Sequence, residues 1–87
     1  MAINLNYGDS FKRTSLVAMM DSLKQELFML CIQNGIDPEA LDVEDPDSDP
    51  TIAASTPQEH NFYAIRRIKQ VCEGYVLAKR KFDNLAE

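Results

Sequence analysis

The alternation of apolar and polar positions is most regular between residues 57 and 86. Apolar residues recur there at alternating steps of four and three, which keeps them on one side of an α-helix. They are Ala64, Ile68, Val71, Tyr75, Ala78, Phe82 and Leu85. A capping box formed by Thr56 and Glu59 precedes them, and Pro57 suits a first helical turn. The pattern therefore predicts a long helix over residues 57–86.

A second stripe with the same spacing lies earlier in the chain. It consists of Leu16, Met20, Leu23, Leu27 and Leu30. The following Asn34-Gly35 is a typical helix end, since glycine readily adopts the left-handed conformation that ends many helices. We therefore expect a helix over residues 10–34.

This first helix is apolar on more than one side. Residues 27–32 are all apolar, and Val17, Phe28 and Ile32 lie off the main stripe. A helix with apolar residues around most of its circumference must be covered on more than one face. A single partner helix would leave these three side chains bare.

The nine residues before the first helix have the period of a strand. Ile3, Leu5 and Tyr7 alternate with Ala2, Asn4 and Asn6. We expect an extended N-terminal arm over residues 1–9. It is either a loose terminus or an arm that lies on a neighbouring subunit.

An acidic loop over residues 35–56 is expected to join the helices. Asp37 and Pro38 are a cap and a first-turn proline, which predicts a short helix at residues 38–41. Leu41 and Val43 are candidates to fold back onto the first helix. The sequence thus predicts an all-α fold, in which two long helices form a helical hairpin within one small domain over residues 1–87.

Length and cysteine content limit how this domain is stabilised. A chain of 87 residues buries little more than roughly 60% of its unfolded surface, so we expect oligomerisation or docking onto a larger body to add stability. Cys31 and Cys72 lie within predicted helices without metal-ligand spacing, and we interpret them as buried thiols in a reducing compartment. There is no signal-peptide pattern and no apolar run long enough for a membrane helix, so we expect a soluble protein, cytoplasmic or in a virion.

Charge is unevenly distributed along the chain. The net charge is −5, with three basic and ten acidic residues in positions 1–50 and six basic and four acidic residues in positions 51–87. The acidic total argues against a dedicated nucleic-acid binder, which usually has a basic domain. The asymmetry would suit electrostatic matching between copies or partners.

Candidate chemistry in the sequence is sparse. Asp45, Asp47 and Asp49 alternate like the first ligands of an EF-hand, but Pro50 stands where that loop needs glycine and Thr56 where it needs glutamate. The only histidine, His60, has no nucleophile in a recognisable arrangement nearby in sequence, and all glycines are isolated. We therefore expect no enzyme, no cofactor and no metal site.

The sequence favours a small structural or assembly protein that acts through protein–protein contacts, as a homo-oligomer or as a minor subunit of a virion or other large complex. The candidate interface residues are Ile3, Leu5, Tyr7, Val17, Leu27, Phe28, Ile32, Tyr75 and Phe82.

Two alternatives stay open. One is an acidic inhibitor or regulator that docks on a basic site of a partner protein. The other is nucleic-acid association through phosphate contacts on the basic side of the second helix. The residues that would make those contacts are Arg66, Arg67, Lys69, Lys79, Arg80 and Lys81.

Overall fold

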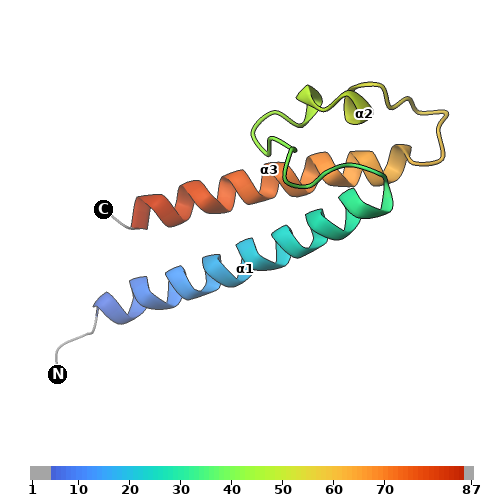
Figure 1. Cartoon of the computed structure of the whole chain (residues 1–87). Helices are drawn as coiled ribbons and strands as arrows, with labels where there is room; N and C mark the ends of the chain where they lie inside the picture. The colour runs from blue at the N-terminus through green and yellow to red at the C-terminus, as the bar shows by residue number, and fades with distance from the viewer. Residues whose placement is uncertain (1–4, 86–87) are drawn as a thin grey trace.

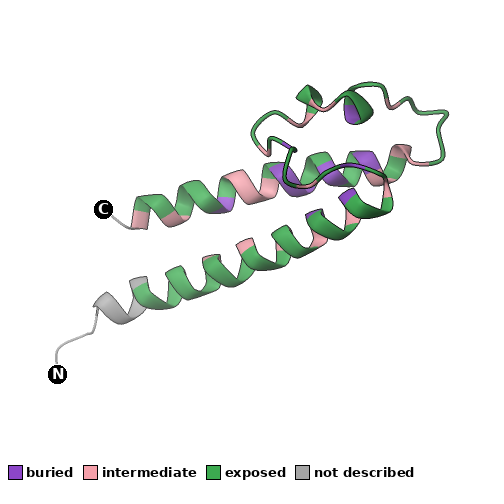
Figure 2. Ribbon diagram, in the orientation of Figure 1, coloured by how far each residue is buried: buried purple, intermediate pink, exposed green. Residues whose placement is uncertain are grey.

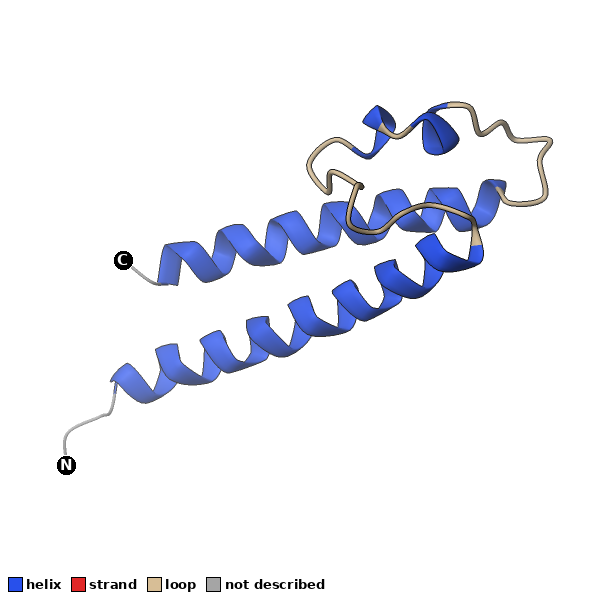
Figure 3. Ribbon diagram, in the orientation of Figure 1, coloured by secondary structure: helices blue, strands red, loops and turns tan. Residues whose placement is uncertain are grey.

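The chain folds as a hairpin of two long helices. The computed structural model describes the backbone of residues 5–85 and the side chains of residues 10–85. Helix α1 (Leu5–Gln33) is joined to helix α3 (Phe62–Leu85) by a connection with a 3-10 turn, η1 (Pro46–Ser48), and a short helix, α2 (Pro50–Ala53) (Figure 3). Residues 5–85 contain no strand. The predicted all-α helical hairpin is confirmed.

The hairpin is an elongated rod. Its Cα atoms extend over 61 × 21 × 19 Å, and α1 begins at the end of the rod where α3 finishes (Figure 1). At that end the Arg13 Nη2 donates a hydrogen bond to the Leu85 carbonyl oxygen at 2.6 Å. Within the described residues, neither long helix combines the length and apolarity that a membrane span requires.

The two predicted stripes form the seam between the helices. Every stripe residue of α1 and α3 is buried or half-buried. Burial is concentrated toward the connection, where Leu27 and Cys31 of α1 meet Ile68 and Val71 of α3 (Figure 2). Farther along α3, Ala78 is also buried. The helices are thus held mainly at one end, and Figure 1 shows them diverging toward the other.

The connection is a third layer of the core and not a free linker. Leu41 and Ile52 are 8% and 1% exposed and join the buried cluster, and Val43 packs against it. Ile65 and Cys72 of α3 belong to the same cluster. The predicted inward packing of Leu41 and Val43 is confirmed, with Ile52 as an additional anchor.

The connection begins with a Schellman turn at the end of α1. Gly35 has a φ of +72°, the left-handed conformation that favours glycine. The Ile36 amide donates to the Cys31 carbonyl at 2.8 Å, and the Gly35 amide donates to the Ile32 carbonyl at 3.3 Å. Ile36 is consequently turned into the core beside Cys31, with 4% of its surface exposed.

The helix starts at Leu5 and not at Ser10. The prediction of an extended arm is therefore wrong for residues 5–9, and residues 1–4 lie outside the described part of the chain. Gly8 lies inside this helix, and a glycine there costs only about 1 kcal/mol, which does not prevent the helix from forming. A lone strand would also have lacked a partner, because residues 5–85 form no sheet.

The predicted short helix at residues 38–41 is wrong. The chain forms a turn at residues 38–40, in which the Ala40 amide donates to the Asp37 carbonyl and the Glu39 amide donates to the Asp37 side chain. The short helical segments lie later, at η1 and α2. Each begins with an Asp-Pro pair. A helix start was predicted from this signal at Asp37 and not at Asp45 or Asp49.

The second long helix also starts later than predicted, at Phe62 and not at Pro57. The Thr56 amide does donate to the Glu59 carboxylate at 3.3 Å, as in a capping box. The residues that follow form turns, in which the Glu59 amide donates to the Thr56 carbonyl and the Phe62 amide to the Glu59 carbonyl. The capping contact therefore closes a turn ahead of the helix.

Candidate interaction surfaces

Three predicted interface residues are exposed along one side of α1. Val17, Phe28 and Ile32 are 41%, 50% and 54% exposed. At 100° per residue, Val17 and Phe28 lie about 20° apart around the helix, and Ile32 follows Phe28 by one turn. The connection leaves all three exposed, although Pro38, Glu39 and Val43 line a hollow together with Phe28. Phe28 and Ile32 are neighbours on this side, whereas Asp21 and Lys24 lie between them and Val17. We call the three exposed side chains the apolar strip.

The other described interface candidates lie within the hairpin. Leu27 is 8% exposed and belongs to the core. Tyr75 and Phe82 are half-buried on the side of α3 that faces α1. Ile3 lies outside the described residues, and Leu5 and Tyr7 are in the first turns of α1, where only the backbone is described. The structure therefore does not bring all nine candidates to one surface.

Sequence reasoning left out several exposed apolar side chains. Phe11, Met19 and Met29 of α1 are 65%, 52% and 55% exposed. Tyr63 and Leu77 of α3 are 76% and 49% exposed. Phe11 was not predicted because it lies one residue after the expected helix start at residue 10 and outside the apolar stripe that begins at Leu16.

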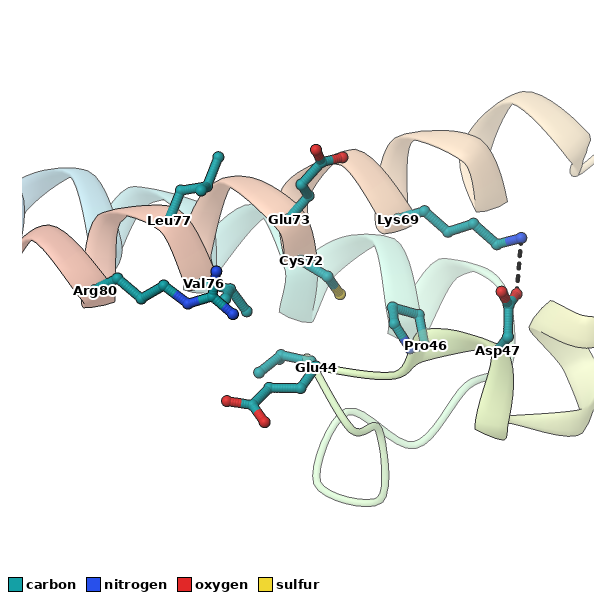
Figure 4. Close-up of a pocket in the computed structure, with 10 residues that line it drawn as sticks. Glu44, Pro46, Asp47, Lys69, Cys72, Glu73, Val76, Leu77 and Arg80 are labelled. Atoms are coloured by element: carbon teal, nitrogen blue, oxygen red, sulfur yellow. Dashed lines mark ion pairs between the residues drawn. The ribbon is translucent and has the colours of Figure 1, made fainter.

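A groove of about 560 Å³ runs between the connection and α3 (Figure 4). The Lys69 ammonium closes one end by an ion pair with Asp47 at 2.8 Å. Glu44 and Arg80 lie toward the other end, and the Cys72 side chain points from α3 toward the connection. The lining carries both signs of charge, so the groove has no clear preference for a charged ligand.

The two thiols are buried and poorly ionised. Burial, with smaller contributions from the Cys31 thiol and the Asp42 carboxylate, raises the pKa of Cys72 to about 11. Burial, with a smaller contribution from Asp49, also raises the pKa of Cys31. A thiol must lose its proton to act as a nucleophile or a metal ligand. The predicted burial of both thiols is confirmed.

The carboxylates of the connection bind the chain's own backbone. The Asp49 Oδ1 accepts hydrogen bonds from the Thr51 amide at 2.8 Å and from the Ile52 amide at 3.4 Å, and so caps α2. The Asp42 Oδ1 likewise accepts a hydrogen bond from the Glu44 amide at 2.9 Å, whereas Asp45, which precedes η1, accepts no capping hydrogen bond through its side chain. Within the described residues, no group of three or more His, Cys, Asp or Glu side chains is arranged to hold a metal ion. His60 lies in an exposed turn before α3.

Two of the six basic residues of α3 are used inside the hairpin. Arg67 forms a two-pronged contact with Glu26 of α1, with N–O distances of 2.5 and 2.8 Å, and Lys69 pairs with Asp47. Among the described residues, the other four form no ion pair. At 100° per residue, positions 79–81 spread over about 200° of the helix. Arg66, Lys69 and Arg80 nevertheless lie within about 60° of one another around α3, on a side that Glu73 interrupts.

Comparisons with protein-family models, with curated proteins and with solved structures found no match.

Proposed function

We propose that this chain is a small structural or assembly protein, acting by protein–protein contact within a larger complex, in the cytoplasm or in a virion as a minor subunit. The observation that carries the proposal is the apolar strip formed by Val17, Phe28 and Ile32, each at least 41% exposed. Phe28 and Ile32 are adjacent on the helix, and adjacent apolar side chains that the fold leaves uncovered are typical of interaction sites.

The shape of the molecule supports this role. A rod 61 Å long whose core lies mostly at one end offers much helix surface for its small volume. Its connection is already packed against α3, so the chain has no further described segment with which to cover α1. A partner helix or subunit would bury the strip in the way that helices of a bundle bury theirs.

The test compares capture of binding partners by immobilised wild type and Phe28→Asp, after circular dichroism has confirmed that both are folded. Captured proteins are identified by mass spectrometry. We expect Phe28→Asp to lose a partner that wild type retains at high salt, because apolar contacts are nearly insensitive to salt. Tyr63→Asp is the matched control, since Tyr63 is 76% exposed on α3 and lies outside the strip. Equal capture by all three proteins would refute the proposal.

A second candidate function is favoured by the connection itself. Residues 34–56 contain seven acidic and no basic residues, and within the described residues only Asp47 of these seven forms an ion pair. Such a segment suits a regulator that docks on a basic site of another protein. Binding of this kind should weaken steeply as salt is raised from low to physiological concentration, which separates it from binding through the apolar strip.

A further inference from the structure

One outward side of α1, flanked by Asp21, carries no charged residue among its described side chains. Six exposed residues follow this side at steps of four and three, and we call them the outer face of α1. They are Phe11, Ser15, Ala18, Ser22, Gln25 and Met29. Ile32 continues the series and is also exposed. The spacing repeats that of the inner stripe, so α1 has a second seam with the geometry of a helix–helix contact.

The charged side chains of α1 lie beside this face and not on it. At 100° per residue, all five that the structure describes are about 60° or more from its centre, with Glu26 the nearest. They are Lys12, Arg13, Asp21, Lys24 and Glu26. A helix face meant for water is normally rich in charge, and this protein has charged residues at 26% of its positions. The composition of the outer face is that of a surface in contact with another helix.

Two of the three residue pairs that lie equally far from residue 20 on the outer face match in side-chain size, and the third, Ser15 with Gln25, does not. The large residues Phe11 and Met29 stand nine residues on either side of that point, and the small residues Ala18 and Ser22 stand two residues on either side. A sequence with this arrangement fits a second copy of itself running in the opposite direction.

We propose that two copies of this chain pair through the outer faces of α1, antiparallel, about a two-fold axis level with Met20. This inference rests on the proposed function and names its partner. In this register Phe11 of each copy lies opposite Met29 of the other, Ser15 opposite Gln25, and Ala18 opposite Ser22. Two-fold interfaces of this kind use the same patch on both subunits.

Packing at the ends of the interface supports this register. Phe11 and Met29 are among the most exposed apolar residues of α1, at 65% and 55%. Beside Met29 the surface has a shallow hollow of about 420 Å³, formed by Lys24, Gln25, Phe28 and Met29. Four residues form the hole that receives one side chain in helix–helix packing, and the Phe11 ring of the second copy would fill it. An aromatic ring beside a methionine sulfur is a favourable contact.

Charge complementarity supports the antiparallel direction. Lys12 and Glu26 lie on the same flank of the outer face. They stand eight residues before and six residues after residue 20, so they are at nearly equal distances from the two-fold axis. Antiparallel pairing therefore brings Lys12 of one copy beside Glu26 of the other, whose carboxylate also binds Arg67 within its own hairpin, on each side of the two-fold axis. A parallel pair would instead place the flank that carries Lys12 and Glu26 on opposite sides of the interface in the two copies, so these residues would not meet. Opposite charges at such flanking positions set the direction of helix pairs.

The first test is the molar mass in solution by light scattering over a wide range of concentrations. We expect a dimer whose dissociation constant rises by roughly tenfold or more in Gln25→Glu, because a charge is then buried without a partner. Gln70→Glu is the matched control, since Gln70 is exposed on α3 and the same substitution there should leave the dimer unchanged. A wild-type monomer at all concentrations, or equal dimers in both variants, would overturn the proposal.

Cysteine cross-linking tests the direction and register. Ser15→Cys and Gln25→Cys are exposed positions, whereas the native Cys31 and Cys72 are buried and stay out of the reaction. We expect a disulfide-linked dimer only when the two variants are mixed and oxidised. In the antiparallel pair the two copies of position 15 are about 15 Å apart, too far for a disulfide. Cross-linking of Ser15→Cys alone would indicate a parallel pair and refute the register.

These experiments separate the dimer from the more general proposal. A monomeric wild type that still captures another protein through Phe28 would contradict the dimer and leave the assembly role standing. A dimer that Gln25→Glu disrupts, together with partner capture that Phe28→Asp leaves unchanged, would support the dimer and contradict the role of the strip.

Discussion

Gly74 in the middle of α3 faces Leu23 of α1. A Cβ atom added to Gly74 would lie 3.7 Å from the Leu23 Cδ1 and 3.9 Å from its Cδ2, which is ordinary van der Waals contact. The glycine is therefore not required by a close approach of the helices. Because alanine is favoured over glycine inside a helix by about 1 kcal/mol, we predict that Gly74→Ala raises the free energy of unfolding by about that amount. Urea denaturation measures it as a higher midpoint with an unchanged slope.

The same substitution should have the opposite sign at Gly35. The φ of Gly35 is +72°, and its Schellman turn directs Ile36 into the core. A Cβ in the left-handed conformation costs roughly 1–2 kcal/mol, although nothing in the surroundings would collide with it. We predict that Gly35→Ala lowers the free energy of unfolding by about 1 kcal/mol. If both glycine variants shifted the urea midpoint in the same direction, the helix and turn assignments would be contradicted.

The contact between Glu26 and Arg67 predicts a dependence of stability on pH. Hydrogen bonding to the Arg67 guanidinium lowers the pKa of Glu26 below its ordinary value of 4.5. A carboxyl with a lowered pKa in the folded state stabilises the protein above its unfolded pKa, and this stabilisation disappears as the pH falls through the folded value. We predict that wild type loses slightly more stability between pH 7 and pH 3 than Glu26→Gln does.

This effect should be small because both side chains are partly exposed, at 38% and 49%, and solvent screens the pair. Urea midpoints of the two proteins at the two pH values provide the measurement, and the titration of the other carboxyls cancels in the comparison. Identical pH dependence in wild type and Glu26→Gln would show that the pair does not form in solution.

The connection contributes to the core through Leu41, which is 8% exposed. Replacing a buried leucine by alanine typically costs 2–5 kcal/mol, so we predict that Leu41→Ala lowers the free energy of unfolding by about 2–4 kcal/mol. Leu77→Ala is the matched control because Leu77 is 49% exposed, and its expected cost is below about 1 kcal/mol. Equal urea midpoints for the two variants would mean that the connection is detached in solution.

The seam of the hairpin was predictable from sequence because its spacing is local. Residues such as Leu27 and Ile68 recur at helical intervals, and any helix that places one of them inward places the others inward too. The burial of both cysteines followed from the same reasoning. The uncovered strip was partly predictable as well, since Val17, Phe28 and Ile32 lie off the stripe of a helix with a single partner.

The structure of the connection was less accessible because it depends on contacts that are distant in sequence. Ile52 belongs to the same buried cluster as Ile65 and Cys72. It is an isolated apolar residue in an acidic segment, so no periodic pattern predicts its burial. The Asp-Pro signal was present three times but produced a turn at Asp37, a 3-10 turn after Asp45 and an α-helix after Asp49. Which form appears is decided by where Leu41 and Ile52 must point to reach the core.

Burial of Cys72 predicts that its thiol is inert in the folded protein. The raised pKa of about 11, against an ordinary value of 9.0, lowers the thiolate fraction at pH 8 by about a hundredfold, and the buried sulfur is also shielded from reagents. We predict that neither Cys72 nor Cys31 reacts with an aromatic disulfide reagent at pH 8 unless denaturant is added. Ser15→Cys, which introduces an exposed thiol, is the control and should label at once. Rapid labelling of wild type without denaturant would contradict the packing of the connection over α3.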